Sequence, residues 1–209
     1  MKRTNARRAT GIAALALTVP FGLAACGNDD SSTAASDKPM SSSSKDSGMS
    51  SDAGAQTFGP GCSAIPTTGG GSFNGMATEP VATAASANPL LKTLVAAVGK
   101  AGLVDTLNSA DALTVFAPTD DAFAKIPSKT LNKVLADKAT LTKILTHHVV
   151  AGQLGPDQID GTHDTLAKDQ VTVSGDENGM TVDGAKVLCG NIPTANATVY
   201  VIDSVLMPS

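Results

Sequence analysis

The sequence predicts a single α+β domain that follows a secretion signal and a flexible tether. Helical periodicity is concentrated between residues 88 and 147, whereas the alternating pattern of strands prevails from residue 148 onward. Helices followed by strands favour an α+β fold with an antiparallel sheet over repeated βαβ units. The chain of 209 residues has room for one domain with appendages, and no internal repeat divides the globular part.

Residues 1–25 have the features of a bacterial lipoprotein signal peptide. Four basic residues among the first eight precede an apolar run that is too short to span a membrane and ends in Leu23-Ala24-Ala25-Cys26. A cysteine directly after Leu-Ala-Ala is similar to the lipobox, in which the thiol takes a diacylglyceryl group before cleavage. We therefore expect Cys26 to be the lipidated mature N-terminus; an ordinary secretory signal is the alternative. Both the general secretory and the twin-arginine route remain open.

The charge and composition exclude nucleic acid as an expected partner. Cleavage after residue 25 leaves eleven basic residues against nineteen acidic ones, a net charge of −8. Aromatic residues make up 3%, with no Trp and a single Tyr200, so aromatic stacking platforms for bases or sugars are not expected. The same charge predicts repulsion from anionic lipid headgroups, so acyl chains on Cys26, rather than a basic patch, would hold the protein to the membrane.

Residues 26–56 are expected to form a disordered, lipidated tether. From Gly27 to Gln56 the chain contains no Val, Ile, Leu, Phe, Tyr or Trp, and it includes the run Ser41–Ser44. A flexible coil of this length reaches on the order of 30 Å, enough to lift a domain off a membrane. Both O-linked sugars and a bare solvated linker are compatible with this composition.

The first half of the domain, residues 57–209, is predicted to be helical. Gly59–Gly75 is rich in Gly, Pro and Thr and is expected to be irregular. Asn88 as N-cap and Pro89 as first helical residue predict a helix that ends between Gly99 and Gly102. Three further helices are each expected to start at a hydroxyl cap: Thr119, Ser128 and Thr140.

The strands are predicted from apolar runs and from period-two alternation. Leu113–Ala117, stopped by Pro118, is typical of a buried strand. The later strands are expected at His148–Val150, Gln170–Ser174, Met180–Val182, Ala185–Leu188 and Thr198–Leu206. Gly175–Gly179 and Asp183-Gly184 have the composition of hairpin turns.

With Cys26 acylated, two cysteines remain in an exported and therefore oxidising setting. A disulfide between Cys62 and Cys189 is the favoured interpretation, and it would join the irregular lead-in segment to the late strands. Two free thiols are the alternative. A metal pair is less favoured, because neither cysteine has a histidine at ligand spacing.

No motif predicts a catalytic, cofactor-binding or metal site. The sequence contains no nucleophile elbow, no His-Glu-x-x-His helix and no P-loop. Asp120 and Asp121 follow the Thr119 cap, where carboxylates complement the helix dipole, and this capping role is favoured over a carboxylate pair. Adjacent residues on a strand face opposite ways, so His148 is expected to be buried and structural, whereas His147 would point outward and tolerate alanine.

Three segments, in order, resemble the fasciclin (FAS1) domain family. Thr114–Phe123 is similar to the first signature motif of the family, and Val201–Leu206 is similar to the second. His148–Val150 lies between them, as the Tyr-His segment of the family does, with His147 at the Tyr position. Gly59–Cys62, Val104–Ser109 and Thr194–Tyr200 resemble an actinobacterial subgroup of the family, which includes mycobacterial surface and secreted antigens.

The resemblance implies a helical layer on an antiparallel β wedge, a disulfide between Cys62 and Cys189, and no catalytic centre. It also implies structural roles for the motif residues Thr119, Asp120, His148 and Asp203. Relatives that bind integrins do so partly through an Asp-Ile pair near the second motif; here Asp203 is followed by Ser204, so that site does not carry over. In the mycobacterial surface antigen of this subgroup, glycosylation of the stalk is associated with threonine. Before Thr57 the tether of this chain has only Thr33.

These features lead to three hypotheses for the function. The first is a monomeric surface protein, anchored by lipid on Cys26, which acts in adhesion or protein interaction and whose acyl terminus innate receptors would sense; the sequence names no partner. The second is a carrier of a hydrophobic small molecule in the cell envelope, with a crevice between helices and sheet. The third, an unrecognised hydrolase, has no local sequence support. No cofactor is expected.

Overall fold

The computed structural model of the protein describes residues 52–208. The predicted signal peptide, Cys26 and the tether up to residue 51 lie outside the described residues. The last residues of the predicted tether contact the domain, because the Ala53 amide donates to Asn74 Oδ1 (2.8 Å) and Asn191 Nδ2 donates to the Gln56 carbonyl (3.0 Å). The domain therefore includes residues 53–56. Within residues 52–208, no helix is long and apolar enough to cross a bilayer.

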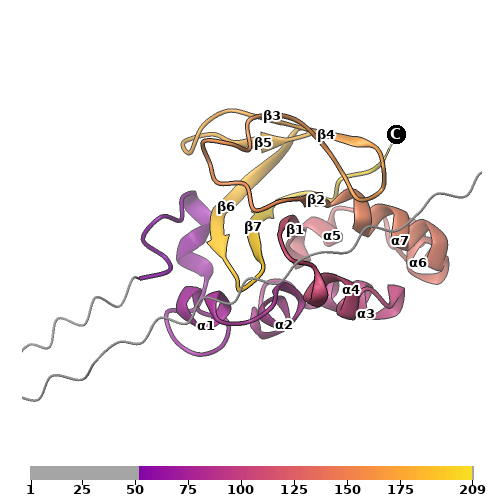
Figure 1. Cartoon of the computed structure of the whole chain (residues 1–209). Helices are drawn as coiled ribbons and strands as arrows, with labels where there is room; N and C mark the ends of the chain where they lie inside the picture. The colour runs from indigo at the N-terminus through magenta and orange to yellow at the C-terminus, as the bar shows by residue number, and fades with distance from the viewer. Residues whose placement is uncertain (1–51, 209) are drawn as a thin grey trace, which may run out of the picture. The chain divides into compact units, whose positions relative to one another are not determined.

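Helices occupy most of the described chain up to residue 147, with one strand among them, and strands follow from residue 149 (Figure 1). The helices are η1 (Pro60–Ala64, a 3-10 helix), α1 (Phe73–Ala77), α2 (Val81–Ala87), α3 (Lys92–Ala101), α4 (Val104–Ser109), α5 (Asp120–Ala124), α6 (Ser128–Ala136) and α7 (Lys138–His147). The strands are β1 (Leu113–Pro118), β2 (Val149–Ala151), β3 (Gly161–Asp164), β4 (Gln170–Ser174), β5 (Thr181–Val182), β6 (Ala185–Pro193) and β7 (Ala197–Ile202).

The strands form one sheet in the order β2-β1-β7-β6-β5-β4-β3. Neighbouring strands are antiparallel except for β1 and β7, which pair in parallel from Leu113 beside Ala197 to Pro118 beside Ile202. The expectation of a wholly antiparallel sheet is wrong at this pair. A long crossover through helices and strands separates β1 from β7 in the chain, and such a crossover permits parallel pairing.

Strands β1 and β7 are buried on both faces. Val115, Ala117 and Val199 point into a core shared with the helices, whereas Phe116 and Tyr200 point into a second core under β3–β5. Register shifts in β6 bend the sheet so that β3–β5 lie on the opposite side of β1 and β7 from the helices (Figure 1). The predicted α+β fold, a helical layer on a β wedge, is confirmed.

Of the three predicted hydroxyl caps, the structure contains one. The Thr119 cap is confirmed, because its hydroxyl accepts from the Ala122 amide (3.2 Å). The cap predicted at Ser128 is one residue late, since the helix starts after Pro127. The cap predicted at Thr140 is also wrong, because Asp137 accepts from the amides of residues 139 and 140.

Asn88 does not start the predicted helix. It ends α2, it is buried, and its Oδ1 accepts from the Leu90 amide (3.0 Å), while its amide group donates to Met76 Sδ (3.7 Å). The helix that follows starts only at Lys92. The segment expected to be irregular contains η1 and the first residues of α1, and no clear sequence pattern indicated α1, α2 or α4.

The hairpin between β4 and β5 is confirmed. Gly175 has φ +102°, and an added Cβ would lie 2.5 Å from the Gly179 carbonyl oxygen, so the turn requires glycine there. The last strand is shorter than predicted, because β7 ends at Ile202 rather than Leu206. His148 precedes β2 and caps α7 instead of opening the strand.

Candidate functional site

The two sequence motifs meet where β1 and β7 end. Because these strands run in parallel, Thr119 lies beside the end of β7, and its amide donates to the Ile202 carbonyl (3.2 Å). Asp203 follows Ile202 directly in the chain. Thr119, Asp120 and Asp203 therefore come together at one end of the sheet, where α5 begins.

Asp120 holds the start of a helix other than its own. It lies in the first turn of α5, but its Oδ1 accepts from the Thr93 amide in the first turn of α3 (2.7 Å). Its own amide donates to the Leu90 carbonyl (2.9 Å). A carboxylate at a helix start satisfies an unpaired amide and interacts favourably with the helix dipole. Asp120 thus ties α5 to α3.

Asp203 accepts hydrogen bonds from three partners. Its Oδ1 accepts from the Lys186 amide (2.9 Å) and from Ser204 Oγ (3.0 Å), and its Oδ2 lies 3.0 Å from Lys125 Nζ. Partial burial raises the pKa of Asp203, but these hydrogen bonds and the lysine charge outweigh it, so the pKa lies below its usual value. Asp203 therefore stays ionised and links β6, β7 and α5.

The motif residues line an open cleft of about 470 Å³, which we call the motif cleft. Its walls come from η1, the segment before α3, α5 and the ends of β6 and β7. They are Gly61, Ala64, Pro89, Leu90, Thr119, Asp120, Asp121, Lys125, Leu188, Val201 and Asp203. The volume falls within the range of small-molecule and side-chain pockets. The partly exposed Leu90 and Leu188 supply apolar surface, and Asp121 adds an exposed carboxylate.

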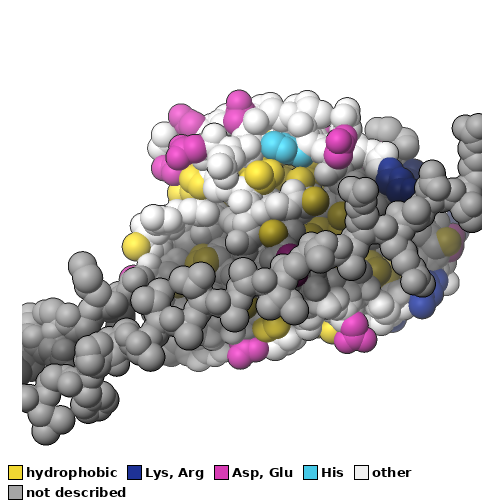
Figure 2. Space-filling model, in the orientation of Figure 1, with side chains coloured by type: hydrophobic (Ala, Val, Ile, Leu, Met, Phe, Trp, Pro, Cys, Tyr) yellow, Lys and Arg dark blue, Asp and Glu magenta, His cyan; other side chains and the backbone are white. Residues whose placement is uncertain are grey.

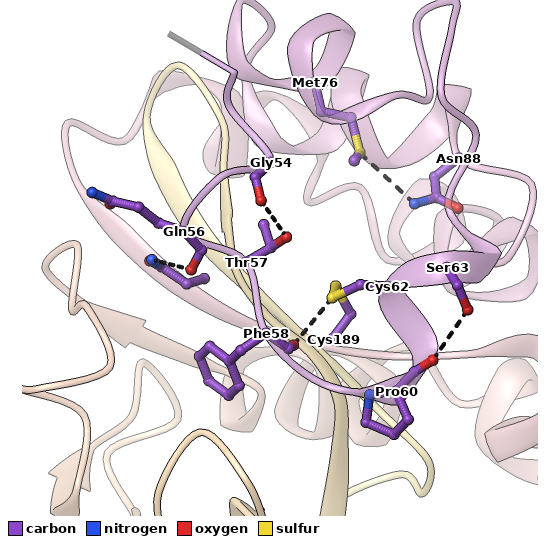
Figure 3. The surroundings of a disulfide bond; sticks show 11 residues. Gly54, Gln56, Thr57, Phe58, Pro60, Cys62, Ser63, Met76, Asn88 and Cys189 are labelled. Carbon is purple, nitrogen blue, oxygen red and sulfur yellow. Dashed lines mark hydrogen bonds between the residues drawn. A yellow bond between two sulfur atoms is a disulfide. The ribbon is translucent and has the colours of Figure 1, made fainter.

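A disulfide between Cys62 and Cys189 attaches η1, one wall of the motif cleft, to β6 (Figure 3). The same junction is reinforced by a backbone bridge in which Phe58 and Gly190 exchange hydrogen bonds (3.3 and 2.8 Å). The Phe58 ring covers Gly190 so closely that an added Cβ would lie 2.4 Å from it. The predicted covalent link between the lead-in segment and the late strands is therefore present.

His148 is a buried, fully hydrogen-bonded side chain between α7 and the C-terminal segment. Its Nδ1 lies 2.8 Å from the Ile144 carbonyl oxygen, and its Nε2 accepts from the Leu206 amide (2.9 Å). An amide donor at Nε2 requires the neutral tautomer with the proton on Nδ1. Burial, reinforced by the neighbouring His147 and only partly offset by the bond to Ile144, lowers the pKa of His148 to about 4.

His147 is also buried, with 3% of its surface exposed, so the expectation that it points outward is wrong. It is the last residue of α7 rather than part of a strand, and its side chain packs against the turn between β3 and β4. Its Nδ1 lies 2.6 Å from Asp169 Oδ1, and Thr165 also donates to that carboxylate.

Burial raises the pKa of Asp169, but the hydrogen bonds from Thr165 and His147 and the electrostatic interaction with His147 outweigh it. The pKa of Asp169 therefore lies below its usual value.

An apolar cavity lies between the helical layer and the sheet, where the carrier hypothesis places its crevice. It is lined by side chains of α2, α3, α4, α7 and β1, and the exposed Val104 and Leu166 stand at its edge. Its volume is about 60 Å³, enough for only a few water molecules. Sites for whole small molecules occupy roughly 300–1,000 Å³, so the closed cavity does not hold one.

Within the described range, residues 52–208, no three His, Cys, Asp or Glu side chains gather where a metal ion would bind. Sequence reasoning identified Thr119, Asp120, His148 and Asp203 but missed the other walls of the motif cleft and the pair His147–Asp169. Lys125 lies just beyond the first motif in the chain, whereas Gly61 and Leu188 come from segments outside both motifs. The only local signal for the pair was the His147-His148 doublet.

Comparison with known proteins places the chain among fasciclin proteins. The profile of the fasciclin domain matches residues 89–208. The chain is 50% identical over 165 residues to "Cell surface glycolipoprotein MPB83" of Mycobacterium bovis, covering 75% of this chain and 74% of that protein. It is 51% identical over 158 residues to "Immunogenic protein MPB70" of Mycobacterium bovis, covering 72% and 81%.

Among solved structures, the FAS1 domain pair of the insect cell adhesion molecule Fasciclin I aligns with 56% of this chain and 45% of its own, at 24% identity and a TM-score of 0.48. The family profile covers more than half of the chain, and the mycobacterial identities extend over most of both proteins. Both signature motifs lie within the matched residues. The chain belongs to the fasciclin domain family.

Proposed function

We propose that this protein is a lipid-anchored surface protein whose fasciclin domain acts in adhesion by binding an extracellular protein through the motif cleft. The lipobox supports attachment to the membrane at Cys26. The similarity to a cell surface glycolipoprotein and to an immunogenic protein supports an extracytoplasmic location. The domain would act without enzymatic chemistry or a cofactor.

The observation that carries the binding role is the motif cleft itself. Its polar motif atoms are already engaged: Thr119 caps α5, Asp120 caps α3, and Asp203 accepts three hydrogen bonds. Groups held in this way give a binding surface a rigid shape, which reduces the entropy lost on association. The apolar Leu188 beside the exposed Asp121 suits a partner segment with an apolar body and a basic tip.

A cell-adhesion assay tests this function. Cells that lack the protein would be complemented with the native chain, with Ala64→Trp, which fills the motif cleft, or with Ala195→Trp, which adds the same bulk at another exposed alanine. We expect Ala64→Trp to reduce adhesion to the level of the deletion and Ala195→Trp to preserve it, at equal surface abundance. Equal adhesion of the two variants would refute binding through the motif cleft.

The lipid anchor is tested in the same cells. Cys26→Ala should release the protein into the medium or leave an uncleaved precursor, because the buried acyl chains supply roughly 0.8 kcal/mol of membrane affinity for each CH₂ group. Retention of an unacylated mature chain in the membrane fraction, shown by intact mass, would contradict the anchor.

The carrier hypothesis has the apolar cavity in its favour, with Val104 and Leu166 at its edge. Because the closed cavity measures only about 60 Å³, a lipid-sized ligand would require the helices to move apart. Adhesion is therefore the better-supported function. Mass spectrometry of the natively purified protein separates the two, since a carrier should retain one bound lipid per chain.

A further inference from the structure

Positive charge is concentrated in one short segment of this acidic domain. Residues 125–143 contain five lysines and a single acid, Asp137. The rest of the described chain, residues 52–124 and 144–208, has four lysines against fourteen acidic residues. The segment comprises the residues that follow α5, all of α6 and most of α7.

The lysines of this segment occupy an exposed edge. Lys129 and Lys133 are one turn apart on α6, opposite the apolar side that carries Leu131, Val134 and Leu135 against the core. Lys138 and Lys143 are exposed on the neighbouring α7. We call Lys129, Lys133, Lys138 and Lys143 the basic edge. In residues 52–208 the structure pairs none of these four with a carboxylate, whereas Lys125 is paired with Asp203.

A second stretch of the chain is acidic. Residues 157–183, which include β3, β4 and β5, hold seven acidic side chains and only Lys168. Figure 2 shows Asp and Glu gathered over the β3–β5 turns, while Lys side chains lie at the end of the molecule occupied by α6 and α7. Positive charge is therefore concentrated on α6 and α7, whereas β3–β5 and the earlier helices are acidic.

We infer that the basic edge docks the domain onto the anionic headgroups of the membrane that holds its anchor. This inference rests on the proposed lipid at Cys26, which brings the domain near a bilayer. Asp52, the first described residue, follows Cys26 by only 26 residues, a length of chain that spans at most about 90 Å, so a lipid at Cys26 keeps α6 and α7 within reach of the headgroups. An anionic bilayer is favoured over a soluble polyanion because the anchor holds it at high effective concentration.

The net charge of the domain does not prevent this contact. Charges separated by more than a Debye length, about 8–10 Å at ordinary ionic strength, are largely screened. A surface in contact with α6 therefore interacts mainly with the basic edge and only weakly with the acidic β3–β5 region. The net negative charge comes from residues outside the basic edge, so its repulsion is weakened by screening where headgroups contact α6.

Vesicle sedimentation with the mature chain, residues 26–209, tests the inference separately from the anchor. Cys26→Ser removes the lipid, and the vesicles are phosphatidylcholine alone or an equal mixture with phosphatidylglycerol. The double variant Lys129→Glu/Lys133→Glu reverses the basic edge, and Lys92→Glu/Lys186→Glu makes the same change in net charge elsewhere. Both pairs are exposed, so folding should be retained.

We expect binding only to the mixed vesicles, and loss of binding at about 1 M salt, where the Debye length falls to about 3 Å. A surface lysine contributes about fivefold in binding, so the basic-edge variant should bind more than about tenfold more weakly and the control only slightly more weakly. Equal losses in both variants, or equal binding to both vesicle types, would overturn docking. Binding to heparin without binding to the mixed vesicles would instead assign the edge to an anionic polysaccharide. A negative vesicle result leaves the Cys26→Ala release assay unaffected.

Discussion

Two adjacent imidazoles, His147 and His148, are buried for different reasons. His148 uses both nitrogens on backbone groups of α7 and of the C-terminal segment. His147 binds the Asp169 carboxylate, while its Nε2 is buried without a hydrogen-bond partner, 3.9 Å from Asp183 Oδ2. The pair joins the end of α7 to segments that follow it by 22 and 58 residues.

We predict that His148→Ala and His147→Ala both destabilise the domain. Removal of either ring leaves buried partners without hydrogen bonds, which typically costs about 1–3 kcal/mol for each site. Thermal unfolding should show both melting temperatures several degrees lower. Lys143→Ala, an exposed change in the same helix, is the control. A His147→Ala protein that melts like the parent would show that the Asp169 contact contributes nothing to stability.

The low pKa of His148 also predicts an acid sensitivity. Because the folded pKa, about 4, lies below the ordinary 6.5, the unfolded chain binds the proton more readily over this interval. Stability should be intact above pH 6.5 and fall by about 3 kcal/mol as the pH drops towards 4. Denaturant titrations at several pH values should show this slope in the parent and its absence in His148→Asn. Asp169 and Asp203, whose pKa values are lowered, affect stability at lower pH. Their contribution to the free energy of unfolding is lost only as those carboxylates protonate.

Among the elements, α3 shows how a helix can depend on a cap from another helix. The sequence places a cap at Asn88, but the first-turn amide of Thr93 is satisfied by Asp120, 27 residues later. The cap becomes available only when α5 packs beside α3. Helix start and tertiary contact therefore form together.

Asp120→Ala should destabilise the domain by about 1 kcal/mol, because it removes the acceptor for the Thr93 amide. Amide hydrogen exchange should accelerate at Thr93 and through the first turn of α3. Asp120→Asn retains an acceptor oxygen and should recover most of the protection, and Asp121→Ala serves as the exposed control. Unchanged exchange at Thr93 in Asp120→Ala would refute the cap.

On the scale of the whole molecule, the disulfide fastens the chain's entry to its late strands. Cys62 and Cys189 are 127 residues apart, so the bond encloses most of the domain. A link across so long a loop constrains the unfolded chain strongly, by about 5 kcal/mol in the chain-entropy account and often less in practice. It also fixes η1 as a wall of the motif cleft.

Cys62→Ser/Cys189→Ser should therefore lower the free energy of unfolding by about 2–5 kcal/mol, measured by denaturant titration. The remaining core should persist, since the second core contains neither cysteine and the first contains many buried side chains besides Cys189. Adhesion should fall at temperatures where the variant is still folded, because η1 loses its attachment. Adhesion equal to that of the parent would show that binding does not depend on η1 as a wall of the motif cleft.

The sequence alone predicted those features whose causes lie within a few residues. The Thr119 cap, the apolar run of β1 and the Gly175–Gly179 turn each carry their physical reason locally, as a hydroxyl acceptor, continuous burial or a glycine at positive φ. Helical periodicity followed by the alternating pattern of strands also sufficed to predict the α+β class. The same local logic failed at Asn88, where a valid Asx turn exists but no helix begins.

Only the tertiary structure decided which distant groups meet. The burial of His147 depends on Asp169, the start of α3 depends on Asp120, and the motif cleft depends on parallel pairing of β1 with β7. The clustering of lysines in residues 125–143 was evident in the sequence, but the exposed edge that they form on α6 and α7 was not. Hydrogen bonds and screened charges act over a few ångströms of space, and the folded chain determines which residues share that distance.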